Sequence, residues 1–268
     1  MIETIPEPVL SRRVERLAVQ IYRDRAALGV AAGAAVAATL RDRLGGQAMV
    51  RMIFAAAPSQ HELLATLREA PGIDWSRVIA LQMDEYLDLP AGAPQRFGLF
   101  LRRHLFDHVR PGAVHPLAAS AIAGDDEAAV RAECARYTAL LADPIDIVCL
   151  GIGENGHLAF NDPPVADFAD PALVKPVDLD LACRQQQVND GCFPALAAVP
   201  RRAITLTIPA LLSGQRLFCA VPGPTKRMAV RAALEGPVAT SCPGSILRTH
   251  PSCILYVDTD SYGAEDRD

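Results

Sequence analysis

The chain has 268 residues, 50% of them hydrophobic and 21% charged, and a formal net charge of −5. This length and apolar content suit a single α/β domain with its own core, and the negative charge without a dense run of Lys or Arg excludes an electrostatic surface for nucleic acid. Seven cysteines form no C-x-x-C pair, so we expect reduced thiols, several of them buried in strands.

Strands and helices alternate along the chain. Helices are predicted over residues 9–24, 29–44, 60–70, 97–107, 126–142 and 225–234, and strands over 49–55, 77–83, 145–150, 217–221 and 253–257. The alternation predicts an α/β fold that is Rossmann-like, with a mostly parallel sheet, helices on both faces and right-handed crossovers, in one domain over residues 1–268.

Two segments depart from this pattern. Residues 162–202 carry repeated prolines and break the alternation, so we expect a lid or insertion beside the site, with a plain surface excursion as the alternative. The alanine-rich run 26–40 is shorter than the roughly 20 residues of a membrane span, and charged residues interrupt the first 15 positions where a secretion signal would stand. A cytoplasmic protein with no membrane partner is therefore expected.

Two predicted strands end in residues suited to proton transfer. The strand 145–150 runs into Gly151-Ile-Gly-Glu-Asn-Gly-His157, and the strand 77–83 is followed at once by Asp84. Ligands of open α/β sheets bind beyond the carboxyl ends of strands, where a carboxylate can be desolvated and act as a base. A lone histidine after a strand is often structural, but the acid at a second strand end favours a catalytic His157.

Five motifs resemble, in order and spacing, those of the glucosamine-6-phosphate deaminases, within a wider group that holds 6-phosphogluconolactonases and ribose-5-phosphate isomerases. They are Met83–Pro90 (MDEYLDLP), Gly151–Asp162 (GIGENGHLAFND), Val221–Lys226 (VPGPTK), Ala232–Pro237 (AALEGP) and Ser245–Pro251 (SILRTHP). The resemblance extends over residues 48 to 258. It implies an aldose–ketose isomerisation with deamination, in which glucosamine 6-phosphate and water give fructose 6-phosphate and ammonia.

The resemblance also implies catalytic roles. His157 would open the pyranose ring, steered by Asn155 and Asp162, and Asp84 would move the C2 proton to C1. Many family members have an aspartate at the place of Asn155 and a glutamate at that of Asp162, so the relay is altered but workable. Proton transfers alone suffice, and no His/Cys/Asp run has metal-ligand spacing, so no metal and no cofactor is expected.

Sugar-phosphate recognition is predicted at two loops. Lys226 follows a glycine at a helix start, and its counterpart in the family contacts the phosphate. Ser59 and Gln60 stand where deaminases typically carry a glycine-rich loop, and they can still donate from a helix N-terminus. The stretch 183–193 aligns poorly with the family segment that supplies a phosphate-binding arginine. Either Arg184 substitutes for that arginine or the arginine is missing.

Two alternatives to the deaminase stay open. One is a 6-phosphogluconolactonase-like hydrolase, although Tyr86 after the acidic strand end and Ala159–Asn161 after the histidine are deaminase-like. The other is a non-catalytic sugar-phosphate sensor, suggested by Asn155 and the missing arginine. The sequence fixes neither the epimer of the substrate, nor allosteric regulation, nor whether the chain forms a homo-oligomer.

Overall fold

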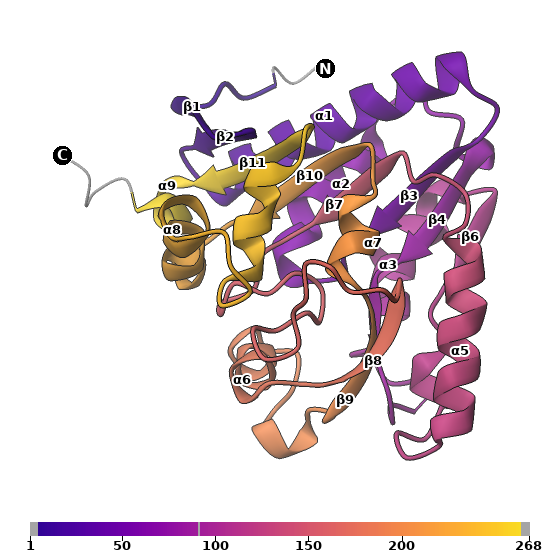
Figure 1. The fold of residues 1–268 in the computed structure, drawn as a ribbon. Helices are drawn as coiled ribbons and strands as arrows, with labels where there is room; N and C mark the ends of the chain where they lie inside the picture. Colours follow the sequence, from indigo (N-terminus) through magenta and orange to yellow (C-terminus); the bar gives the residue numbers. More distant parts are fainter. Residues whose placement is uncertain (1–4, 91, 264–268) are drawn as a thin grey trace.

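The central sheet has eight strands, in the order β1-β2-β11-β10-β7-β3-β4-β6 (Figure 1). The computed structural model describes residues 5–90 and 92–263. Every neighbouring pair in this sheet is parallel except β1 and β2. The strands are β1 (Leu10–Val14), β2 (Leu17–Tyr22), β3 (Val50–Phe54), β4 (Val78–Gln82), β6 (Ala113–His115), β7 (Ile147–Leu150), β10 (Arg216–Val221) and β11 (Cys253–Asp258).

Helices cover both faces of the sheet, as predicted. An apolar cluster lies on each face of the sheet, and successive side chains of the central strand β3 alternate between them. Ile53 packs into the first cluster, and Met52 and Phe54 pack into the second. The second cluster includes the buried sides of α1 (Arg25–Gly46) and α2 (His61–Glu69). The first includes those of α5 (Glu127–Leu140), α7 (Ile208–Leu212) and α8 (Arg227–Glu235). The other α-helices are α3 (Phe97–Leu101), α4 (Asp107–Val109), α6 (Leu181–Asn189) and α9 (Thr259–Tyr262).

The prediction of a helix over residues 9–24 is wrong, because this segment forms the β1–β2 hairpin. Leu17, Val19 and Ile21 alternate with less apolar residues and are all buried, which is the period of a strand. β2 then pairs in parallel with β11 and so extends the sheet. Only the β2 half of the segment shows this alternation, because β1 carries two consecutive arginines and is mostly exposed.

Residues 162–202 are more regular than expected. They contain β8 (Val174–Asp178) and α6, and β8 pairs with β9 (Arg202–Leu206) and through it with β5 (Asp84–Tyr86) in a separate antiparallel sheet. An apolar cluster that includes Tyr86, Phe160 and Phe193 fixes this unit to the histidine loop. The unit occupies the lower part of Figure 1. That it closes over a substrate stays a prediction.

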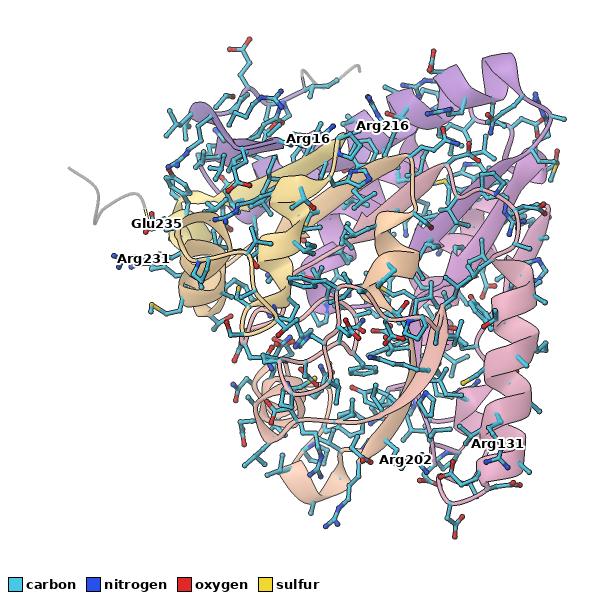
Figure 2. All side chains as sticks on the ribbon, viewed as in Figure 1. Arg16, Arg131, Arg202, Arg216, Arg231 and Glu235 are labelled. Carbon is cyan, nitrogen blue, oxygen red and sulfur yellow. The ribbon has the colours of Figure 1, made fainter. Side chains whose placement is uncertain are left out.

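The surface carries charged side chains of both signs on separate elements. Arg131 lies on the outer side of α5, and Arg231 and Glu235 lie on α8, where their side chains form an ion pair at 3.1 Å (Figure 2). The seven cysteines are free, and Cys149, Cys219 and Cys253 are buried in strands as expected. In the described ranges, no helix combines the length and apolar character required to cross a bilayer.

Candidate active site

Four adjacent parallel strands deliver their carboxyl ends to one cavity of about 650 Å³. The segments that follow β3, β4, β7 and β10 all contribute to its wall: 55–60, 83–84, 151–153 and 222–226. Asp84, His157, Ser59, Gln60 and Lys226, predicted from separate parts of the sequence, all line this cavity. The structure therefore brings five of the eight predicted site residues to one surface, at the edge of the sheet where ligands of such folds bind.

Asp84 enters the cavity because the chain leaves the main sheet after β4 and pairs with β9 instead. Only 7% of Asp84 is exposed, and this burial, with Glu85 beside it, raises the pKa of the Asp84 carboxyl well above its usual value. Glu85 is fully buried, and its carboxylate accepts hydrogen bonds from the backbone N–H groups of Phe97 and Gly98. Glu85 thus has a structural environment, while Asp84 has that of a desolvated base.

His157 is oriented by two neighbours of its own loop. Its Nδ1 lies 2.8 Å from Asn155 Oδ1 and 3.0 Å from Asp162 Oδ1, and Asn155 Nδ2 donates to the same Asp162 oxygen at 2.9 Å. The His157 backbone N–H also donates to Asn155 Oδ1, at 3.0 Å. With Nδ1 occupied in this triangle, the other ring nitrogen, Nε2, remains for a ligand in the cavity that His157 lines.

Asp162 provides the negative charge of the triangle. Its burial acts to raise its pKa, but the hydrogen bonds and charge of His157, with bonds from Asn155 and the Asp180 backbone N–H, outweigh burial and lower the pKa below its usual value. Asp162 is therefore ionised at neutral pH, and its carboxylate oxygen lies 3.0 Å from the His157 Nδ1. Asn155 bridges the two side chains, which is the orienting role that the sequence predicts for an amide at this position.

Glycines give the loop its shape. A Cβ on Gly153 would lie 2.1 Å from Cε1 of the His157 ring, so only glycine lets the ring lie against the backbone here. Gly156 has φ +88°, and its N–H donates to Gly153 O to close the turn. Gly153 thus leaves room for the His157 ring, and Gly156 provides the backbone conformation that places His157 at the cavity wall.

Lys226 also lines the cavity, and only 5% of it is exposed. Burial lowers the pKa of its ammonium, and the carboxylates of Asp190 and Glu154 partly oppose this shift. Both carboxylate oxygens of Asp258 accept the Gly223 N–H, at 3.1 and 3.0 Å, and Gly223 has φ +93°. The loop before Lys226 is thereby fixed, and it directs a buried cation into the cavity.

Residues 23–255 match the family model of the glucosamine-6-phosphate isomerases/6-phosphogluconolactonase. The chain belongs to this family. It is 32% identical to a glucosamine-6-phosphate deaminase of Halothermothrix orenii over 206 residues, which cover 75% of this chain and 80% of that protein. The structure of a monomeric glucosamine-6-phosphate deaminase matches with a TM-score of 0.79 and 26% identity, over 91% of this chain and 98% of that chain. The 6-phosphogluconolactonase of Thermotoga maritima shares the fold at a TM-score of 0.71 and 17% identity, over 90% and 99% of the two chains.

The prediction that Arg184 could stand in for the family arginine is not supported by its position. The Arg184 side chain does not line the cavity, and its Nη2 donates to the backbone carbonyls of Leu196 and Val199, at 2.8 and 2.9 Å. It ties α6 to the segment that follows. The residues that this region gives to the cavity are instead Gln186, Gln187 and Asp190–Cys192.

Arg25 is a site residue that sequence reasoning missed. It is the first residue of α1, and it lines the cavity together with Ser59 and Lys226. No motif marks it, because it lies 34 positions before Ser59 and reaches the cavity only through the packing of α1 on α2. A second cation of the cavity, besides Lys226, is therefore supplied by a segment with no sequence signature.

Three potential metal ligands meet behind the histidine. Ligand atoms of His157, Asp162 and Cys183 lie within 4.8 Å of one another, although their spacing in the sequence gives no metal signature. Burial, followed by the charge of Asp162, raises the pKa of the Cys183 thiol well above its usual value. The protonated thiol donates to Asp162 and adds to the set of donors around that carboxylate.

Proposed function

We propose that this protein is an isomerase and deaminase of an amino sugar phosphate, most specifically glucosamine 6-phosphate, with fructose 6-phosphate and ammonia as products. The observation that carries the proposal is the placement of a desolvated carboxylate, Asp84, an oriented histidine, His157, and a buried lysine, Lys226, on one cavity. Membership of the family and the named deaminase relatives support the same chemistry. Because sugar phosphates are made and used in the cytoplasm, the proposal also locates the enzyme there.

His157 would open the ring. As the C1–O5 bond breaks, O1 loses its proton and becomes the aldehyde oxygen, and O5 gains a proton. His157 Nε2 is the group that can exchange these protons, while Asp162 stabilises the imidazolium form from the Nδ1 side. Asn155 keeps the ring in the required orientation.

Asp84 would carry out the isomerisation. Its carboxylate takes the proton from C2, and the electron pair forms the C1–C2 double bond of an enolamine as the C1–O1 double bond opens and O1 takes a proton from solvent. The proton held by Asp84 then returns to C1, and the nitrogen lone pair forms a double bond to C2. The imine left at C2 is then hydrolysed by water, which releases ammonia and leaves the C2 ketone. The raised pKa of Asp84 makes its ionised form a stronger base than an exposed aspartate, which suits abstraction of a carbon-bound proton.

The deciding experiment is an assay of ammonia release by the purified protein. Glucosamine 6-phosphate, galactosamine 6-phosphate and 6-phosphogluconolactone are tested in parallel, with fructose 6-phosphate measured by a coupled reductase. Equal amounts of ammonia and ketose phosphate from an amino sugar phosphate are the expected result. Lactone hydrolysis without ammonia would replace the proposal with the lactonase, and sugar-phosphate binding without any turnover would replace it with the sensor.

A further inference from the structure

Two strong cations line the cavity, and one of them, Arg25, has no counterpart among the expected phosphate ligands. In the described part of the chain, Arg25 and Lys226 are the Arg and Lys residues that line the cavity. The α6 region, expected to give an arginine, gives a carboxylate instead, at Asp190. Asp190 acts electrostatically on both Arg25 and Lys226. A phosphate dianion bound here needs a second cation to outweigh this carboxylate.

Arg25 is held in a fixed orientation with one edge free. Its Nε donates to Glu62 Oε1 at 2.8 Å, and its Nη2 donates to Glu62 Oε2 and to Pro58 O, both at 3.0 Å. These contacts use the Nε–H and both hydrogens of Nη2. Nη1 keeps two donors, since no contact of this atom occurs within residues 5–90 and 92–263. A guanidinium fixed on one side offers preorganised donors on the other.

Two glycines of α1 make this arrangement possible. A Cβ on Gly29 would lie 2.1 Å from Glu62 Cβ, and one on Gly33 would lie 2.6 Å from Thr66 Cβ, so α1 and α2 approach more closely than other residues would allow. Gly29 follows Arg25 by one helical turn, which sets Arg25 beside Glu62 at the start of α2. The same packing places Arg25 against the Pro58–Gln60 turn, where Ser59 lines the cavity.

We propose that Arg25 is the arginine that binds the substrate phosphate, together with Lys226, and that Glu62 positions it. This inference rests on the proposed function for the identity of the substrate, but the ligand class follows from the donors themselves: a phosphate monoester dianion. In this proposal Arg25 of α1 replaces the phosphate-binding arginine that the family has in the α6 region. Arg184 of α6 instead donates hydrogen bonds to backbone carbonyls.

The test compares Arg25→Gln with Arg23→Gln. Arg23 has the same charge two residues away, its side chain is 78% exposed, and it pairs with Asp24 outside the cavity. For Arg25→Gln we expect the KM of glucosamine 6-phosphate and the inhibition constant of inorganic phosphate to rise together, about 10- to 100-fold, with kcat changed less than about threefold. Arg23→Gln should match the wild type in all three quantities. Equal behaviour of the two variants would overturn the proposal.

Glu62→Gln tests the positioning role through a double-mutant cycle. Alone it should raise KM several-fold, and in the Arg25→Gln background it should add nothing, because Glu62 acts through Arg25. An additive effect would show that Glu62 acts elsewhere. Thermal unfolding of each variant monitors the fold, since loss of the Arg25–Glu62 pair also weakens the contact between α1 and α2.

Equilibrium binding of inorganic phosphate separates this inference from the proposed function. If the wild type releases no ammonia, the deaminase proposal fails, yet weaker phosphate binding by Arg25→Gln than by Arg23→Gln still supports Arg25 as the anion ligand. If the wild type is an active deaminase and phosphate binds both variants equally, the proposed function stands and Arg25 is not the phosphate ligand.

Discussion

Two groups of site residues are assembled in different ways. Asn155, His157 and Asp162 lie within eight residues of one loop and contact one another directly. Arg25, Ser59 and Lys226, which we propose as phosphate ligands, come from three distant segments and line one cavity only through the packing of α1, α2 and the loop after β10. The orientation of His157 is thus encoded locally, while the positions of Asp84 and of the proposed phosphate ligands depend on tertiary packing.

This difference predicts separable effects for substitutions in the two groups. In the proposed mechanism Asp84 and His157 act on bonds that break, so changes there should appear mainly in kcat. Arg25 and Lys226 are proposed to hold a group that does not react, so changes there should appear mainly in KM. The substitutions below test this separation, beginning with the largest effect.

Asp84→Asn should lower kcat by about 10³-fold or more, because it removes the base that takes the C2 proton. Phosphate inhibition should stay close to that of the wild type, since the proposed phosphate ligands are untouched. Steady-state ammonia release with phosphate as inhibitor measures both quantities. A variant with near-normal kcat would remove Asp84 from the reaction.

The pKa of Asp84 gives the same prediction a pH dependence. The base must be ionised, so kcat/KM should fall as the pH drops through the raised pKa of Asp84, well above the usual value for an aspartate. Folding raises the pKa of the Asp84 carboxyl above its unfolded-state value of 3.8. The free energy of unfolding therefore decreases as the pH rises from 3.8 to the pKa of the folded state. Asp84→Asn should therefore raise Tm at neutral pH, and this gain should vanish below about pH 4.

Asp162→Asn should lower kcat by about 10²-fold, because His157 loses the charge that stabilises its protonated form. Asn155→Ala should cost less, about tenfold, since it removes an orienting amide and no charge. Asp167→Asn is the matched control, because Asp167 is exposed and accepts a hydrogen bond only from the Ala169 backbone within the described residues. If Asp162→Asn and Asp167→Asn gave equal rates, the triangle would have no part in the chemistry.

Lys226→Met should raise KM about tenfold or more with a smaller change in kcat, because a buried ammonium is replaced by an apolar side chain of similar length. Arg231→Met on the exposed side of α8 removes the same charge outside the cavity and should leave KM unchanged. A kcat effect of Lys226→Met as large as that of Asp162→Asn would contradict the division between catalytic residues and phosphate ligands.

The sequence predicts those parts of the molecule whose signals are local. Strands such as β7 and β10 are short apolar runs, and the glycine-rich histidine loop follows β7 directly, so both could be found from residue patterns. β5, β8 and β9 gave weaker signals, because β5 has three residues and β8 contains a proline. Arg184 and Arg25 could not be ranked from the sequence, since which guanidinium faces the cavity depends on how α6 and α1 pack.

Asp190→Asn is expected to have the smallest effect and the opposite sign. Removing a carboxylate that interacts with Arg25 and Lys226 should lower KM about threefold at neutral pH, because the phosphate no longer meets a like charge. The same carboxylate helps to keep Lys226 protonated against the lowering of its pKa by burial. In Asp190→Asn that pKa should fall further, so the gain in affinity should disappear at alkaline pH, where Lys226 loses its charge.

KM measured from neutral to alkaline pH, with the exposed Asp178→Asn as control, tests both the lower KM at neutral pH and its disappearance at alkaline pH. A KM that rises at neutral pH would mean that Asp190 contacts the substrate favourably and that the phosphate lies elsewhere in the cavity.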